Sequence, residues 1–356
     1  MAFLKIENVK IGGVAACVPD CLQDNMTYDI LSEEERKKYI ETTGVHFRHV
    51  TDKDTCTSDL CYEAAEKLIS GLCWNKSEID ALVFVSQTPD YKMPTTACTL
   101  QYRLGLPPST LTFDISLGCS GYVYGLSVLS SMVASGNIKK ALLLVGNTQS
   151  KNVNYRDKST YLLFGDAGTA TALEYNPTEP DTMLFNLQTY GDGMNSIIIP
   201  DGMYRNPVNE SSFIESTDEE GNIRTPMQLK MDGMDVFSFV ISKVPKCIKG
   251  LIEKYQITDD MVDFYLLHHA NKFLMEKIRK KLNLAQEKTP YNIENFGNSS
   301  GACVPLLMVT NCKDKLQSGT TRMLFTGFGV GLSLGACYLT TKNIVVSELV
   351  VYKNDK

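Results

Sequence analysis

A cysteine among small residues follows a short apolar segment. Residues 113–121 read Phe-Asp-Ile-Ser-Leu-Gly-Cys-Ser-Gly, which predicts a strand end that turns into a helix over 122–134. Cys119 would then lie at the helix N-terminus, where unpaired N–H groups and the helix dipole favour an anion. A thiol in that position has a lowered pKa and can attack a thioester carbonyl. Taken alone, the pattern fits a core cysteine better, because the chain has 11 cysteines.

Two further segments supply an imidazole and a carboxamide. Residues 266–271 read Leu-Leu-His-His-Ala-Asn, a histidine pair after a predicted buried strand. Ligands of parallel sheets gather beyond the carboxyl ends of the strands, so a catalytic imidazole is expected there, although a structural histidine is the simpler alternative. Residues 295–301 read Asn-Phe-Gly-Asn-Ser-Ser-Gly, and Asn298 either caps the helix that follows or faces the same cleft.

A glycine-rich segment completes the set of candidates. Residues 327–335 read Gly-Phe-Gly-Val-Gly-Leu-Ser-Leu-Gly. Glycines let the backbone approach a substrate closely and supply N–H donors for an oxyanion. The segment is not a dinucleotide fingerprint, because the spacing after Gly331 is wrong and a buried strand rather than a helix follows.

The elements that position these residues occur twice along the chain. Each copy has a buried strand, a turn of small residues, a helix that ends at a glycine and a second buried strand. The first copy has them at 81–85, 118–121, 122–134 and 141–145, and the second at 264–267, 297–301, 302–316 and 323–325. This repetition predicts two similar α/β halves with mostly parallel strands. The turns with Cys119 and Asn298 would then face one cleft between the halves.

The expected halves are residues 1–175, with the cysteine, and 176–356, with the histidine and asparagine. A polar segment of about forty residues, near 190–230, lies within the second half. Loops of this length are usually functional covers or mobile inserts. A solvated excursion without a role is the alternative.

Composition narrows the class of protein. The 356 residues are 43% hydrophobic and 21% charged, which predicts a globular chain. With 41 acidic and 35 basic residues, the net charge of −6 argues against sequence-independent nucleic-acid binding. No apolar run reaches about 18 residues, and lysines interrupt the first twenty, so no membrane association or export is expected. The cysteines lie mostly in apolar segments, which fits a reducing compartment such as the cytoplasm. The cysteines lack CxxC spacing and the chain has only four histidines, so a metal site is not indicated.

These motifs together resemble the β-ketoacyl-[acyl carrier protein] synthase III family of the thiolase superfamily, over essentially the whole chain. The resemblance rests on five segments: DISLGCSGYVYGLS around Cys119, FGDAGTA at 164–170, HHAN at 268–271, FGNSSGACVP at 296–305 and GFGVGLSLGA at 327–336. It implies an α/β fold, the thiolase-like duplicated αβαβα layered fold with two pseudo-twofold related halves.

The resemblance also implies roles for single residues. Cys119 would be the nucleophile and Asn298 the family's catalytic asparagine. HHAN resembles the family's HQAN, which makes His268 rather than His269 the catalytic imidazole. The N–H groups of Cys119 and Gly331 would form the oxyanion hole.

The implied reaction transfers an acyl group from a thioester to Cys119 and then joins it to malonyl-[acyl carrier protein] with loss of CO2. The product is a 3-oxoacyl thioester, as in fatty acid biosynthesis, and no cofactor or metal is expected beside the thioester substrates. One alternative is an acyltransferase that passes the acyl group to a hydroxyl or amine. Another is a non-catalytic subunit that binds acyl carrier protein.

The family further implies a homodimer and a basic surface for acyl carrier protein. Lys272, Lys280 and Lys281 lie on the helix predicted after HHAN and suit an acidic carrier, although a plain solvated face is the alternative. The residue that shapes the acyl pocket across the dimer interface, often Phe, is Met93 here. Its flexible thioether leaves the acyl chain length open.

The chain departs from the family at the site for the adenine of CoA. The family's W-x-x-x-R-T-G-I motif corresponds to residues 38–45, Lys-Tyr-Ile-Glu-Thr-Thr-Gly-Val, so its Trp and Arg are absent. A further family arginine is Lys158. The acyl donor is therefore either an acyl carrier protein or a CoA that is held differently.

Overall fold

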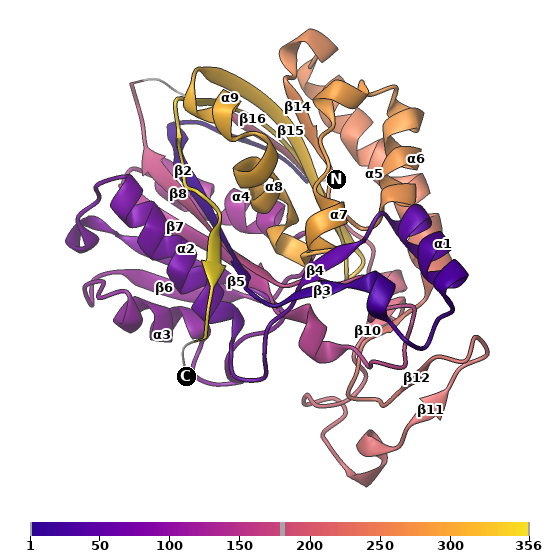
Figure 1. The fold of residues 1–356 in the computed structure, drawn as a ribbon. Helices are drawn as coiled ribbons and strands as arrows, with labels where there is room; N and C mark the ends of the chain where they lie inside the picture. The colour runs from indigo at the N-terminus through magenta and orange to yellow at the C-terminus, as the bar shows by residue number, and fades with distance from the viewer. Residues whose placement is uncertain (1, 179–181, 355–356) are drawn as a thin grey trace.

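The computed structural model describes residues 2–178 and 182–354, and two large mixed sheets dominate this part of the chain (Figure 1). The larger sheet has seven strands, with β18 (Val350–Tyr352) also pairing with β2. Its order is β17 (Val345–Val346), β2 (Val9–Pro19), β8 (Ala167–Tyr175), β7 (Lys140–Asn147), β5 (Ala81–Val85) and β6 (Leu111–Ile115). The smaller sheet has the order β1 (Ala2–Ile6), β9 (Met183–Thr189), β16 (Ser333–Lys342), β15 (Thr320–Gly329) and β14 (Phe264–Leu266).

Helices lie between the sheets and on both outer faces. The inner layer contains α4 (Gly121–Ala134) and α8 (Cys303–Asn311), whose apolar side chains share one core with both sheets. On the outer face of the larger sheet are α2 (Thr57–Gly71) and α3 (Thr96–Arg103), and on that of the smaller sheet α5 (Gly233–Tyr255) and α6 (Lys272–Leu282). The remaining helices are α1 (Glu33–Thr43), α7 (Ile293–Phe296) and α9 (Lys313–Gln317). The five layers confirm the predicted duplicated αβαβα fold.

The sequence of β5 shows how the layers arise. Successive side chains of a strand point to opposite faces. Ala81, Val83 and Val85 enter the core between the sheets, whereas Leu82 and Phe84 pack beneath the outer helices. Because both faces are covered, the strand is apolar throughout, as is typical of a central strand.

The prediction of mostly parallel strands is only partly correct. Parallel pairing joins β5 to β6 and β7, and β14 to β15. Antiparallel pairing joins β8 to β2 and β7, and β16 to β15 and β9. The three-residue link between β15 and β16 explains part of this difference, because parallel neighbours need a long crossover whereas antiparallel neighbours need only a short turn.

The two ends of the described chain exchange places between the halves. β1 pairs with β9 in the smaller sheet, while β17 and β18 pair with the outer edge of β2 in the larger sheet. The expected division into 1–175 and 176–356 therefore does not separate the two sheets at these ends. Each exchanged segment covers a strand that would otherwise expose unpaired backbone groups.

A close contact between α2 and β8 generates a stability prediction. A Cβ at Gly168 would lie 2.5 Å from the backbone nitrogen of Cys61 and 2.6 Å from the carbonyl carbon of Leu60. Gly168→Ala must push the helix away from the sheet, so we expect the free energy of unfolding to fall by about 1–3 kcal/mol. Urea denaturation measures this change. Gly191→Ala is the matched control, because a Cβ there meets nothing within 4 Å; equal midpoints for the two variants would contradict the prediction.

Candidate active site

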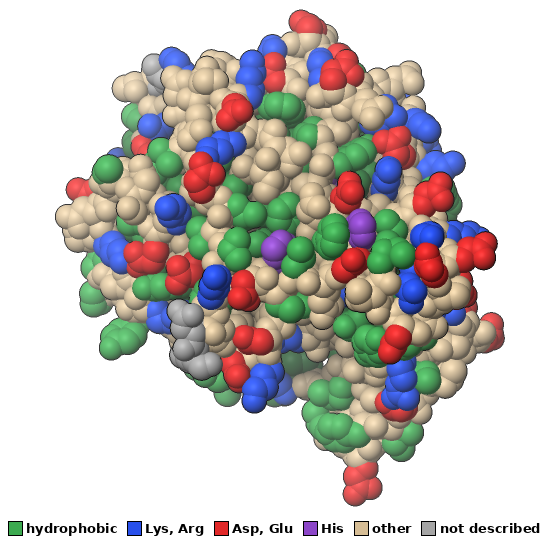
Figure 2. Space-filling model, in the orientation of Figure 1, with side chains coloured by type: hydrophobic (Ala, Val, Ile, Leu, Met, Phe, Trp, Pro, Cys, Tyr) green, Lys and Arg blue, Asp and Glu red, His purple; other side chains and the backbone are tan. Residues whose placement is uncertain are grey.

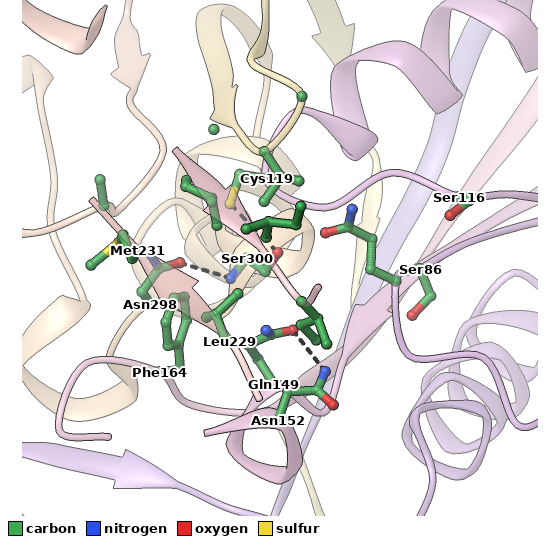
Figure 3. A pocket seen from close by; sticks show the side chains of 18 of the residues that line it. Ser86, Ser116, Cys119, Gln149, Asn152, Phe164, Leu229, Met231, Asn298 and Ser300 are labelled. Atoms are coloured by element: carbon green, nitrogen blue, oxygen red, sulfur yellow. Dashed lines mark hydrogen bonds between the residues drawn. The ribbon is translucent and has the colours of Figure 1, made fainter. Parts of the chain in front are cut away.

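A cavity of about 960 Å³ lies at the carboxyl ends of strands from both sheets. Cys119, His268, Asn298 and Gly331 all line it, so the structure brings together the four residues that the sequence placed in the site. Figure 3 shows the Cys119 sulfur, Ser300 and Asn298 close to one another within this cavity. The shared cavity follows from the duplication, because the turn after β6 and the turn before α8 approach each other across the boundary between the halves.

Cys119 lies in the turn between β6 and α4, two residues before the helix begins. Its Sγ is 3.6 Å from Ser300 Oγ. Burial raises the pKa of this thiol, and the Ser300 hydroxyl and the backbone N–H of Val330 lower it by less. The helix start had predicted a lowered pKa, and this expectation is wrong for the free enzyme because desolvation of the thiolate outweighs the favourable donors.

The glycine-rich segment packs directly against the cysteine. A Cβ at Gly329 would lie 2.9 Å from Cys119 Sγ, so only a glycine allows β15 to end this close to the sulfur. The backbone of the next residue, Val330, lowers the pKa of the Cys119 thiol. Val330 and Gly331 both line the cavity.

His268 follows the end of β14 and is almost fully buried. Its ring meets that of Phe328 edge-on, with the ring centroids 5.1 Å apart. Burial, with His269 beside it, lowers the pKa of His268 to about 3. The imidazole is therefore neutral at physiological pH and offers one N–H donor and one acceptor.

Asn298 is held in place by hydrogen bonds of its backbone and of its side-chain oxygen Oδ1. Its N–H donates to Leu163 O at 2.9 Å, and its carbonyl accepts from Gly165 N at 3.2 Å. Its Oδ1 accepts from the N–H of Ser300 at 2.9 Å in a local turn. Asn298 does not cap the helix, because the residue at the N-cap of α8 is Ala302. With its oxygen engaged, the carboxamide offers its NH2 group as the donor for a cavity ligand.

The structure separates the two adjacent histidines. His269 does not line the cavity, and its ring packs edge-on against Tyr291 at 6.2 Å between centroids. Burial also lowers the pKa of His269, to about 4. His269 is therefore a packing residue, as expected for one of the pair.

The polar segment near 190–230 covers the cavity. It contains the short strands β10 (Ile197–Ile198) and β11 (Ser216–Thr217), and also β12 (Ile223–Arg224) and the start of β13 (Lys230–Met231). Apolar side chains from it line the cavity: Met194, Ile197, Ile198, Ile199, Met203 and Leu229, with Met231 just beyond. Of the two roles considered, a cover is therefore favoured over a solvated excursion.

Sequence reasoning missed several cavity residues. Ser300 lies in the second repeated turn, beside the asparagine that drew attention. Gln87 follows β5 after one serine, and Gln149 follows β7 after one threonine. The strand-end rule that found the histidines would also have found both glutamines, because the signal is position rather than residue type.

The remaining predicted residues lie outside the cavity. Met93 is 78% exposed, in the segment between β5 and α3, and does not line the cavity of its own chain. Lys272 and Lys280 are exposed on α6. Lys281 is also exposed but donates to the carbonyl of Ile241 on α5 at 3.0 Å. Since Asn271 and Leu274 line the cavity, α6 begins at its rim.

No group of three or more His, Cys, Asp or Glu side chains within residues 2–178 and 182–354 could hold a metal ion. None of the helices described is long and apolar enough to cross a membrane.

Comparisons with known proteins agree with this geometry. The family model of 3-oxoacyl-[acyl-carrier-protein (ACP)] synthase III matches residues 113–193, and the model of its C-terminal part matches residues 252–341. The β-ketoacyl-[acyl-carrier-protein] synthase III of Enterococcus faecalis is 34% identical over 84% of this chain and 88% of its own. The corresponding protein of Lactococcus lactis strain IL1403 is 30% identical over 93% of this chain and 98% of its own.

A solved structure matches the whole chain. The crystal structure of a 3-oxoacyl-(acyl-carrier protein) synthase from Burkholderia xenovorans LB400 is 37% identical, covers 99% of both chains and has a TM-score of 0.93. Fold and sequence thus define a condensing enzyme of the thiolase fold, an acyltransferase. More narrowly, the chain belongs to the 3-oxoacyl-[acyl carrier protein] synthase III family.

The raised pKa of Cys119 predicts its reactivity toward an alkylating reagent. An ordinary thiol has a pKa of about 8.5, so we expect iodoacetamide to modify Cys119 with a rate that still increases above that pH. In Ser300→Ala the profile should move to higher pH, because the lost hydroxyl lowers the pKa of the thiol. Peptide mass spectrometry follows the modification, and the exposed Cys73 reports that the reagent is active. A midpoint below pH 8 for Cys119 would be incompatible with the burial described.

Proposed function

We propose that Cys119, His268 and Asn298 catalyse the decarboxylative condensation of an acyl group with malonyl-[acyl carrier protein]. The observation that carries this proposal is the single cavity that all three side chains line, with a hydroxyl 3.6 Å from the sulfur. A thiol nucleophile and two separate hydrogen-bond donors match the two halves of the reaction, acylation and condensation.

In the acylation step, the Cys119 sulfur attacks the thioester carbonyl and the carrier thiol leaves. Because burial keeps the thiol protonated at neutral pH, its proton must be transferred as the C–S bond forms. The neutral imidazole of His268 accepts it and passes it to the leaving thiolate. The backbone N–H groups of Cys119 and Gly331, which both line the cavity, hold the oxyanion. The backbone of Val330 lies beside them and lowers the pKa of the thiol.

In the condensation step, the thioester carbonyl of the malonyl group accepts hydrogen bonds from His268 and Asn298. Loss of CO2 leaves an enolate, whose negative charge the two donors stabilise by about 3 kcal/mol each. The enolate carbon attacks the acyl carbonyl on Cys119, the C–S bond breaks, and the sulfur takes up a proton. The products are a 3-oxoacyl thioester, CO2 and the free thiol, and the sequence of steps requires no cofactor.

Acyl carrier protein is the proposed partner, docking on α6. In Figure 2, Lys and Arg side chains are prominent at the upper right, where Figure 1 places α6. Lys272, next to the rim of the cavity, and Lys280 and Lys281, near the other end of α6, are the docking residues. In a homodimer, Met93 would reach the acyl end of the other cavity, which agrees with its exposure here. A cytoplasmic location stays a prediction.

Removal of either enolate-stabilising donor should separate the two steps. We expect His268→Ala and Asn298→Ala to lower the rate of CO2 release from labelled malonyl-[acyl carrier protein] by about 10²–10³. Asn298→Ala should still form the acyl adduct on Cys119, measured by intact mass, whereas Cys119→Ala should form none. His269→Gln is the matched control and should keep its activity.

The same measurements decide between the alternatives. An acyl adduct without CO2 release would favour transfer to a hydroxyl or amine, and no adduct with any CoA or carrier thioester would indicate a non-catalytic subunit. A panel containing each acyl group on both CoA and acyl carrier protein identifies the donor.

Charge reversal on α6 tests the docking surface. Lys272→Glu and Lys280→Glu should raise the KM for malonyl-[acyl carrier protein] about tenfold with kcat unchanged, because the acidic carrier loses attraction. Malonyl-N-acetylcysteamine, which has no carrier protein, should show no such change. Lys67→Glu, on α2, is the control for net charge. A rise in KM that is equal for Lys67→Glu would refute a local docking surface.

A further inference from the structure

The cavity has two chemically different sides. Its apolar side lies under the cover and against α5 and α6, next to the proposed docking surface. The other side is formed by residues that follow β5 and β6 and is rich in polar side chains: Ser86, Gln87, Asp90 and Ser116. Gln149 and Asn152, which follow β7, lie where the two sides meet, beside Leu229 of the cover. Figure 3 shows Ser86 and Ser116 on the opposite side of Cys119 from Asn298 and Met231.

Gln87 places a carboxamide next to the nucleophile. A Cβ built on Gly118 would lie 2.3 Å from Gln87 Oε1 and 3.4 Å from Ser300 Oγ, and Ser300 Oγ is the atom 3.6 Å from the sulfur. The carboxamide of Gln87 and the sulfur of Cys119 therefore flank the same small space. The first atoms of an acyl chain on Cys119 must pass this carboxamide.

Two further carboxamides line the cavity. The Gln149 and Asn152 side chains share one long hydrogen bond of 3.5 Å, which leaves their other polar groups for a ligand. Asp90 does not take part, because its carboxylate has a hydrogen bond from Ser58 and its Oδ1 is enclosed by protein. A polar group that a bound chain covers without pairing is costly.

We propose that the acyl group loaded onto Cys119 carries a hydroxyl near its thioester end, so that the preferred donor is a short hydroxyacyl thioester rather than a plain alkyl one. This inference rests on the proposed function and specifies its first substrate. The hydroxyl donates to the Gln87 carboxamide oxygen or accepts from its amide, whereas an alkyl chain would leave these groups unpaired. The apolar side remains for the part of the CoA or acyl carrier protein that holds the thioester, because this part enters from the rim at α6.

The polar side chains of the cavity, Gln87 above all, should also make a plain alkyl chain a poor substrate. A site that pairs with a substrate hydroxyl discriminates strongly against the analogue that lacks it, since its own polar groups then lose their partners. We expect a preference on the order of 10–100-fold.

The test compares N-acetylcysteamine thioesters of butyrate and 3-hydroxybutyrate, which differ by one hydroxyl and need no carrier protein. Acylation of the wild-type protein is followed by intact mass, with Cys119→Ala as the blank. A rate at least tenfold higher for the 3-hydroxybutyryl thioester supports the proposal. An equal or higher rate for butyryl overturns it while leaving the proposed function intact. Acylation by neither, nor by acetyl and hexanoyl thioesters, contradicts the proposed function itself.

Variants locate the preference. Gln87→Leu should remove most of it by raising the rate with butyryl and lowering the rate with 3-hydroxybutyryl, and Gln149→Leu provides a second, independent substitution if the first does not fold. Gln286→Leu makes the same replacement on the surface outside the cavity and should retain the wild-type ratio. If the ratio of the acylation rates with the 3-hydroxybutyryl and butyryl thioesters is unchanged in both cavity variants, the two glutamines do not determine the preference for the acyl group.

Discussion

Direct backbone contact between the two halves is the constraint on which the active site depends. A Cβ at Gly301 would lie 2.8 Å from the carbonyl oxygen of Gly118, and one at Gly327 would lie 2.6 Å from that of Cys119. No side chain separates the turns at these points, so the sulfur, Ser300 and the end of β15 are held at fixed distances. The geometry is set by main chain from both sheets rather than by adjustable side chains.

The burial that this contact produces acts on the nucleophile and the imidazole in opposite senses. It raises the pKa of Cys119 and lowers that of His268, so both groups are uncharged in the free enzyme. An ion pair of thiolate and imidazolium is thereby disfavoured at rest. Charge then develops only when a substrate brings its own carbonyl to the donors, where desolvated hydrogen bonds are most effective.

Local sequence patterns predicted those elements that depend on neighbouring residues. The apolar run of β5, the glycine stop after α4 and the repeated turns all follow from short-range patterning, and the fold class followed from their repetition. Contacts between distant segments could not be read in this way. The pairing of β1 with β9, the Lys281 bond to α5 and the approach of the Val330 backbone to Cys119 depend on tertiary structure. The apolar lining that the cover gives the cavity was not predicted either, because its few apolar residues are dispersed among polar ones in the sequence.

The exchange of end segments between the sheets affects the order in which the protein can be completed during synthesis. The larger sheet begins with β2 at residue 9, yet the outer edge of β2 is paired by residues 345–352. That edge of β2 therefore stays unpaired until residues 345–352 have been synthesised. Until residues 345–352 emerge, the exposed edge of β2 can pair with strands of other chains. Another segment of the chain, or another protein, must cover this edge in the meantime.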